Sequence, residues 1–443
     1  MVSAAEQLAA NLNFSALGKA EELKKRIWFT LGALLVYRLG TYVPLPGIDP
    51  NVWEQVFKSQ AGGILGMFNM FAGGGINRMA IFALNIMPYI SASIIIQLLT
   101  TVSKQLEALK KEGEAGRKTI NQYTRYLTVV LATAQAYGIA VGLQGAGNVV
   151  AEPGVFFLVS TTVTLTGGTM FLMWLGEQIT SRGIGNGISL IILAGIVAEL
   201  PAALAGMLEL GRQGALSTGL ILIVLVMAVA VIAFIVFMER AQRRLLIQYP
   251  KRQVGNKMFE GQSSHLPLKL NTSGVIPPIF ASSLLLLPAT IANFNTGTGP
   301  EWFQWVVTQF GHGRPLFLIF YIAMIVFFAF FYTAIVFNPT ETADNLKKHG
   351  GFIPGIRPGE RTAEYIDYVL SRITVVGAAY LAIVCLIPEV LISYASVPFY
   401  FGGTSLLIVV SVTMDTVAQV QGYLLAHQYE GLIKKSKLRG RRK

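Results

Sequence analysis

The sequence carries few charged residues. Asp, Glu, Lys and Arg make up 13% of its 443 residues, about half of the ~25% that is usual in soluble domains, whereas 53% of the residues are hydrophobic. This composition excludes an ordinary soluble domain. It indicates a chain that crosses a membrane several times.

Cysteine and catalytic motifs are also scarce. Cys385 is the single cysteine, so no internal disulfide can form and the sequence offers no redox or metal framework. No Walker-type nucleotide motif, HExxH or GxSxG occurs. The four histidines share no motif and fall in or near expected loops, at His265, His312, His349 and His427. We therefore expect a protein that is not an enzyme and needs no cofactor or metal.

Apolar windows long enough to cross a bilayer, ~20 residues each, recur along the chain. They cover residues 27–43, 78–102, 123–143, 155–176, 188–207, 218–238, 273–294, 316–337, 373–392 and 399–425. The stretch before Lys24 contains acidic residues and lacks an apolar core, so we expect no cleavable signal peptide there. The windows predict an all-α polytopic membrane protein with ten transmembrane helices.

The positive charge is distributed unevenly between these windows. If the gaps alternate between the two membrane faces, one face receives 30 of the 35 Lys and Arg residues and the other receives four. This asymmetry predicts cytoplasmic N- and C-termini, and it argues against a nucleic-acid binder although the net charge is +12. The remaining cation, Arg38, lies inside the first window, where it can snorkel to the interface or face the protein interior.

Five windows precede the external gap near residue 211, and five follow it. Two halves with an odd number of spans are oppositely oriented, so repeats would be related by a pseudo-twofold axis in the membrane plane. We expect two inverted five-helix halves, at residues 27–210 and 211–425, between a cytoplasmic N-terminal segment, 1–26, and a basic cytoplasmic tail, 426–443.

A glycine-rich stretch over residues 62–75, GGILGMFNMFAGGG, precedes the second window. Only about ten residues separate Gly63 from Gly73, roughly 15 Å of helix, whereas a bilayer core needs ~20 residues. This segment is therefore interpreted as re-entrant. Backbone that does not span persists at membrane depth only against protein or a water-filled cavity, so a hollow interior is expected.

Two long basic segments, residues 239–271 and 338–372, are expected as large cytoplasmic loops of the second half. In the second one, apolar residues alternate with Pro354, Gly355, Pro358 and Gly359, a pattern typical of a stiff tip that presents Arg357. A rigid basic tip favours a specific partner. The alternative is a solvated loop that rests on anionic lipid headgroups.

Five segments of the chain together carry a family resemblance. They read FALNIMPYISASIIIQLL (82–99), KKEGEAGRKTINQYTR (110–125), GTMFLMWLGEQITSRGIGNGIS (168–189), FNPTETADNLKKHGGFIPGIRPGE (337–360) and PFYFGGTSLLIVV (398–410). In this order they closely resemble the SecY family, whose bacterial members are the central subunit of the Sec protein-conducting channel. Asn85 stands where glycine is expected in the family's pattern.

The resemblance implies an hourglass pore between the two halves, closed by a plug helix at about residues 62–75. The plug residues would be Gly63, Ile64, Leu65, Met67, Phe68, Met70, Phe71 and Gly74, joined to the second span through a glycine hinge at 73–75. The pore ring would consist of Ile86, Ile90, Ile188, Ile192, Ile279 and Ile408. An apolar ring repels water and ions yet fixes no particular side chain, so diverse unfolded polypeptides can pass. Without the resemblance, isoleucines four apart would be interpreted as helix packing.

The resemblance also implies a lateral gate between the second and seventh spans, with Gln97 and Asn271 as its polar members. A signal sequence would bias this gate towards the open state, and apolar segments would leave through it into the membrane. The residues expected to dock a SecA-like ATPase motor or the ribosome are Arg243, Arg244, Lys251, Arg252 and Arg357. SecE-like and SecG-like small subunits, surrounding phospholipid and a location in the bacterial cytoplasmic (inner) membrane follow from the same resemblance.

An ion-coupled secondary transporter of small solutes is the alternative function. Such a protein needs ionisable groups near the bilayer midplane, and Asp415 is the clear candidate, with Glu389 near an outer end. One carboxylate is weak support, so we expect Asp415 to have a structural role.

Overall fold

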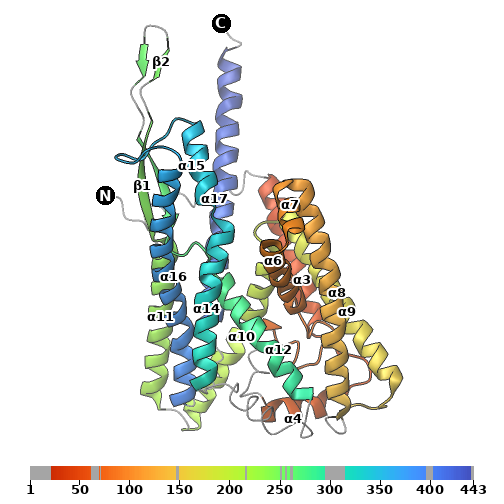
Figure 1. Cartoon of the computed structure of the whole chain (residues 1–443). Coiled ribbons are helices and arrows are strands. Elements are labelled where there is room, and N and C mark those ends of the chain that lie inside the picture. The colour runs from red at the N-terminus through yellow and green to blue at the C-terminus, as the bar shows by residue number, and fades with distance from the viewer. Residues whose placement is uncertain are drawn as a thin grey trace. The chain divides into compact units, whose positions relative to one another are not determined.

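The computed structural model describes residues 21–60, 69, 71–145, 149–214, 217–249, 252–254, 257–259, 263–294, 315–395 and 403–440 (Figure 1). Side chains are described for these residues except 58–60, 252–254, 257–259, 286–294, 389–395 and 427–440. By its internal contacts the chain forms two compact units. Unit 1 comprises Met1–Gly206, Thr290–Thr298 and Ile408–Lys443, and unit 2 comprises Met207–Ala289 and Gly299–Leu407.

Helices dominate the described part of the chain. They are α3 (Glu21–Gly40), α4 (Pro50–Gln60), α6 (Met87–Val102), α7 (Lys104–Lys111), α8 (Glu114–Gly145), α9 (Val155–Arg182), α10 (Gly187–Arg212), α11 (Thr218–Arg240), α12 (Ile276–Phe294), α14 (Pro315–Val336), α15 (Pro339–Lys348), α16 (Glu360–Ala395) and α17 (Gly403–Gly440). Seven helices in the described residues are long and apolar enough to cross a membrane. The all-α polytopic fold is therefore confirmed. The count of ten spans stays a prediction, because α6 has only 16 residues.

The second span begins at Met87 and not at Arg78, where the hydropathy pattern put it. Residues 72–79 and 81–86 form turns instead of helix. The reason is the backbone: Gly73, Gly74, Met79 and Asn85 all have positive φ, and a right-handed helix cannot continue through such residues. Pro88, in the first turn of α6, then suits a helix start.

Unit 1 is built on α8 and α9, which pack along each other, with α6 against α8 and α3 against α9 (Figure 1). Close approach is possible because small residues recur every fourth position on the buried face of α8, at Thr124, Thr128, Ala132, Ala136 and Ala140. The turn between α9 and α10 is tied down on both sides. Ile184 N donates to Thr30 Oγ1 of α3 at 3.1 Å, and Gly185 N donates to Gln419 Oε1 of α17 at 2.9 Å.

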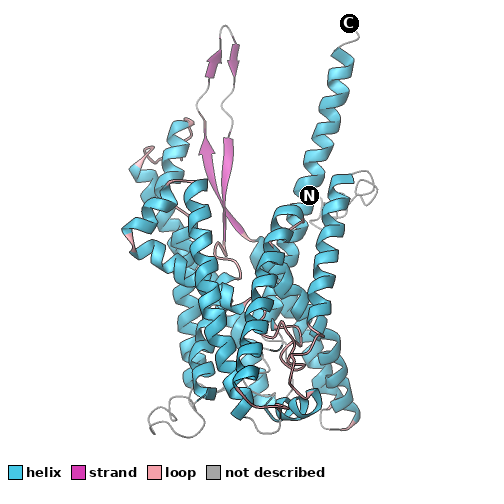
Figure 2. Ribbon diagram, turned by 90° about the vertical axis from the view of Figure 1, so that its right-hand side faces the viewer, coloured by secondary structure: helices cyan, strands magenta, loops and turns pink. Residues whose placement is uncertain are grey.

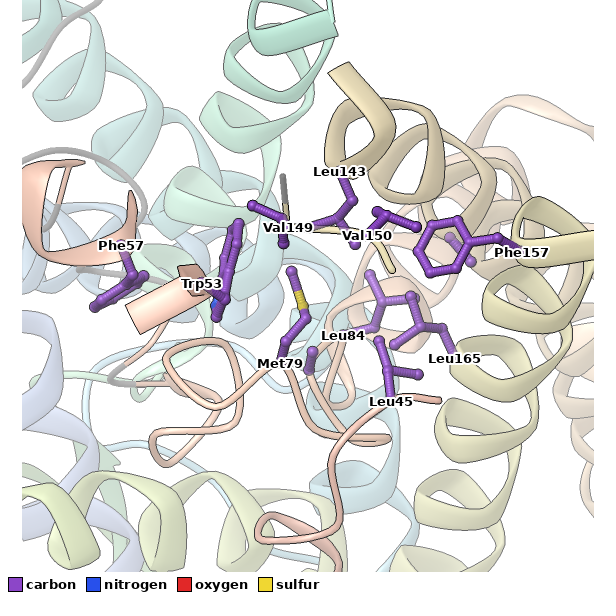
Figure 3. Close-up of a cluster of buried hydrophobic side chains, with 12 residues drawn as sticks. Leu45, Trp53, Phe57, Met79, Leu84, Leu143, Val149, Val150, Phe157 and Leu165 are labelled. Atoms are coloured by element: carbon purple, nitrogen blue, oxygen red, sulfur yellow. The ribbon is translucent and has the colours of Figure 1, made fainter. Parts of the chain in front are cut away.

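A second packing centre in unit 1 joins the segments between the long helices (Figure 3). Trp53 of α4, Met79 of the turn region and Val149 before α9 are buried together there. Trp53 Nε1 also donates to Ile76 O at 2.7 Å, so the indole has its polar partner as well as its apolar contacts. This cluster joins α4 to the turns that precede α6 and to the segment before α9.

Unit 2 contains α11 and α14 packed against α16, and an antiparallel hairpin of β1 (Gln242–Gln248) with β4 (Ser263–Lys269). Figure 2 shows these two strands side by side as a ribbon. Farther along the same hairpin, β2 (Arg252–Val254) pairs with β3 (Lys257–Phe259). The segment 239–271, expected as a loop, is thus largely β-structure.

The segment 338–372 is also more ordered than a loop, because it contains α15 and the first residues of α16. Asn338 caps α15 by accepting hydrogen bonds from Thr340 N and Glu341 N. The start of α16 is amphipathic, with Ala363, Ile366 and Val369 buried. Mean hydropathy over a long window does not detect such a half-polar helix, which explains why the sequence indicated a loop there.

Candidate functional site

The hinge region before α6 is the most constrained part of the candidate site. Of the predicted plug residues, Gly63, Ile64, Leu65, Met67, Phe68 and Met70 lie outside the described residues. Phe71 is 3% exposed, and its carbonyl oxygen accepts a hydrogen bond from Asn85 Nδ2. Gly74 N donates to Asn69 O at 2.9 Å, and Asn69 Oδ1 accepts from Asn77 N at 2.8 Å. The end of the glycine-rich segment is therefore bonded to the turns that lead into α6.

Two glycines in this region are required by geometry. Gly73 has φ +62° and Gly74 has φ +80°, values at which side chains with a Cβ are strained. A Cβ atom at Gly73 would lie 2.9 Å from Gly195 Cα of α10. Asn85, with φ 48°, has the same left-handed conformation, which gives a physical reason why glycine is expected at that position.

Five of the six predicted ring residues lie on four helices, and the sixth, Ile86, lies just before one of them. Ile86 immediately precedes α6, one turn before Ile90, and Ile90 N donates to Ile86 O at 3.1 Å. Ile188 and Ile192 lie one turn apart on α10. All of these and Ile408 of α17 belong to unit 1, whereas Ile279 of α12 belongs to unit 2. Ile86, Ile90, Ile192 and Ile408 are buried, and Ile188 and Ile279 are half-buried. Their convergence into one ring stays a prediction.

The two predicted gate residues have different surroundings. Asn271 is buried and bonded within unit 2: its Nδ2 donates to Glu239 Oε1 at 2.6 Å and to Gly274 O at 3.0 Å. It thereby ties the end of β4 to the end of α11 and the start of α12. Gln97 Oε1 of α6 is buried and has no hydrogen-bond partner among the described residues. Among the described residues, the side-chain oxygen of Gln97 therefore differs from the Asn271 amide in having no partner.

Three of the five predicted docking residues, Arg243, Arg244 and Arg357, lie on one small folded platform, although the sequence indicated two separate loops. Backbone hydrogen bonds join Gln248 of β1 to Phe352, at 2.9 Å and 3.0 Å. Beneath them, Leu245, Leu268 and Ile353 pack with the start of α16. We call β1, β4, residues 349–359 and the start of α16 the basic platform.

On the basic platform the arginines are exposed. Arg357 lies in the loop before α16, where its carbonyl oxygen accepts from Thr362 Oγ1 at 2.9 Å. Arg243 and Arg244 are successive strand residues and therefore point to opposite faces of the hairpin. Lys251 lies outside the described residues, and of Arg252 only the backbone, in β2, is described.

Comparison with known proteins decides the family. A family model described as SecY matches residues 80–417. The protein translocase subunit SecY of Escherichia coli (strain K12) is 56% identical over 430 residues, which cover 96% of this chain and 97% of that protein. The chain belongs to the SecY family. The SecY subunit of Vibrio cholerae serotype O1 is 57% identical over 431 residues, again covering 96% of this chain and 97% of that protein.

Solved structures share the SecY fold at much lower identity. One described as the structure of a protein conducting channel has a TM-score of 0.63 at 17% identity, covering 90% of this chain and 92% of that chain. Sec61 in a canine ribosome-channel complex has a TM-score of 0.60 at 16% identity, with the same coverage. A SecY protein whose plug domain is described as stabilising the closed translocation channel has a TM-score of 0.58 at 16% identity, also covering 90% and 92%.

One intramembrane carboxylate was overlooked in the sequence. Glu199 lies within the predicted fifth span and is now found on α10, beside Arg38 of α3 at 4.0 Å. The signal that could have found it is the coexistence of one lone arginine and one lone glutamate in two apolar windows, since each is costly there without the other. Asp415, by contrast, is exposed on α17.

Proposed function

We propose that the chain is the central pore-forming subunit of a Sec protein-conducting channel. It passes unfolded polypeptides across the membrane and releases apolar segments sideways into the bilayer. The observation that carries this proposal is the 56% identity to a protein translocase subunit SecY along 96% of the chain. The short α6, preceded by buried turns, agrees with it, because irregular backbone at membrane depth needs protein or a cavity beside it.

In this proposal two barriers close the resting channel: the plug at residues 62–75 and the isoleucine ring. The ring excludes water because its side chains offer no hydrogen bonds. Gln97 and Asn271 line a lateral gate, which a signal sequence opens by binding the open state more tightly than the closed one. The chain itself catalyses no reaction, so the driving force comes from a partner or from the proton-motive force.

The partners follow from the charge and position of the basic platform. Arg243, Arg244 and Arg357 are exposed cations on a folded support, which suits an anionic or acidic partner. We infer docking of the ribosome or of a SecA-like ATPase motor at this platform, together with SecE-like and SecG-like small subunits in the membrane. The location inferred is the bacterial cytoplasmic membrane, with both termini in the cytoplasm, because the Lys and Arg residues favour one face.

The test is complementation. Bacterial cells depleted of their own SecY should accumulate unprocessed secretory precursors, and expression of this chain should restore processing. The same gene with an early stop codon, carried on the same vector, is the control. Full membrane insertion of the chain without any restored processing would contradict the proposal. An ion-coupled transporter of small solutes would instead fail to restore processing, would lose its transport activity with Asp415→Asn, and would tolerate charge reversal on the basic platform.

A further inference from the structure

Arg38 is a charged residue in an apolar span, and its guanidinium group bonds both to the glycine hinge and to the end of α3. It is 25% exposed, and its Nη1 donates to Gly73 O of the glycine hinge. Nη1 also donates to Thr41 Oγ1 at 3.4 Å, and Nη2 donates to Tyr42 OH at 3.1 Å. The guanidinium fork therefore joins the end of α3 to the hinge, 35 residues farther along the chain.

Glu199 approaches the same hinge from α10. Its carboxylate lies 4.0 Å from Arg38 Nη2, and the two side chains are equally shielded, each 25% exposed. A Cβ atom built on Gly74 would meet Glu199 Oε1 and would lie 3.0 Å from Arg78 Nη1. One turn earlier on α10, Gly195 Cα would lie only 2.9 Å from a Cβ atom built on Gly73. The hinge backbone is thus enclosed by α3 and α10, with opposite charges beside it.

The charges at the hinge depend on one another. Arg38 and Arg78 both lie over the ring of Tyr42, with their Cζ atoms 5.0 Å and 4.1 Å from its centroid. Two guanidinium groups so close repel each other, and Glu199 beside them offsets that repulsion. Removal of the Glu199 carboxylate would leave Arg38 and Arg78 as two partly buried cations beside the Gly73 carbonyl, which accepts a hydrogen bond from Arg38. Such uncompensated charge weakens the local structure more than the loss of a surface pair does.

We propose that Arg38 and Glu199 are positioning residues that clamp the hinge Gly73–Gly74 and so hold the described end of the plug segment, residues 71–75, in its resting place. This inference rests on the proposed function of that segment as a plug. The clamp acts through the hinge carbonyl and the carboxylate, and neither residue needs to touch the translocating polypeptide. Opening the plug requires these contacts to separate, so their strength sets the fraction of channels that rest open.

The experiment measures the resting ion leak of the purified full-length channel complex, reconstituted in lipid vesicles without any substrate polypeptide. Glu199→Gln and Arg38→Met should each raise the leak about tenfold, since each removes a charged group that holds the hinge in place. The double variant should leak no more than Arg38→Met alone, because the two residues form one unit. Arg38→Lys should restore part of the seal, as it keeps the charge but loses the fork.

The matched control is a second ion pair in the same unit. Arg125 of α8 and Glu177 of α9 are joined by two hydrogen bonds, at 2.9 Å and 2.8 Å, away from the hinge. Glu177→Gln makes the same chemical change and should leave the leak unchanged. An equal leak in Glu177→Gln and Glu199→Gln would overturn the proposal, and so would an unchanged leak in Arg38→Met.

A plug deletion separates the two hypotheses. Removal of residues 62–72 should raise the leak if the proposed function is right. If that deletion raises the leak and the clamp variants do not, the clamp is refuted while the plug stands. If the deletion itself leaves the leak unchanged, the plug assignment is refuted, and the clamp with it.

Discussion

At the scale of single residues, Asn85 combines a strained backbone conformation with a side-chain hydrogen bond that glycine could not make. Its φ of 48° is unfavourable for any residue with a Cβ, although asparagine tolerates it better than most. In return, Asn85 Nδ2 donates to Phe71 O across the hinge region, a contact that glycine cannot make. The strain and the hydrogen bond therefore act in opposite directions on stability.

We expect Asn85→Ala to destabilise the protein more than Asn85→Gly does, by about 1 kcal/mol, because alanine loses the hydrogen bond and keeps the strain. Thermal unfolding of both variants in the same detergent measures the difference. The control is Ala140 of α8, a buried helical position, where glycine should be the less stable residue by about 1 kcal/mol. If Asn85→Ala were as stable as Asn85→Gly, the left-handed conformation would be contradicted.

At the scale of elements, the hairpin of the basic platform has one edge that tolerates proline. Leu270 N donates to Ala241 O, so by antiparallel alternation the amides of Leu268, Leu266 and Ser264 also face β1. Pro267, which has no amide hydrogen, falls at an outward position between them. The proline therefore fits the strand without breaking its ladder.

This register predicts opposite effects of proline at two neighbouring exposed residues. Ser264→Pro should break a hydrogen bond to Ile247 and cost about 1 kcal/mol, whereas His265→Pro should be tolerated, because its amide points away from β1. Amide hydrogen exchange of residues 242–248 reports the ladder directly. Equal loss of protection in both variants would show that the register is different.

The tip of the same platform makes a functional prediction. Arg357→Glu should block export while the chain remains inserted, because it reverses the charge at the exposed tip that is proposed to meet the motor or ribosome. Arg212→Glu is the control, since Arg212 is also exposed and pairs with Glu209 at 3.2 Å but lies at the end of α10, outside the basic platform. Processing of secretory precursors in depleted cells measures both. Normal export with Arg357→Glu would count heavily against docking at the tip.

At the scale of the whole molecule, the proposed pore ring takes its six isoleucines from segments that are far apart in the sequence. Most ring residues belong to unit 1, and Ile279 comes from unit 2. Such a ring would make the seal depend on residues that are far apart in the sequence.

We expect Ile192→Asn and Ile279→Asn to raise the resting ion leak to a similar degree, about tenfold, because a polar group lowers the cost of wetting an apolar constriction. The matched control is Ile191→Asn. Ile191 is fully buried on the same helix as Ile192 but points elsewhere, so its substitution should lower stability without a selective leak. A leak from Ile191→Asn as large as that from Ile192→Asn would contradict the ring.

The sequence by itself determined the class of this protein, the helical content and the family. Hydropathy and charge asymmetry act locally along the chain, so windows and loops can be recognised without knowledge of contacts. The tertiary structure alone decided where α6 begins, how Gln248 meets Phe352, and that Glu199 lies beside Arg38. These features join residues far apart in the chain or depend on backbone angles that packing imposes, so the pattern within any one window does not reveal them.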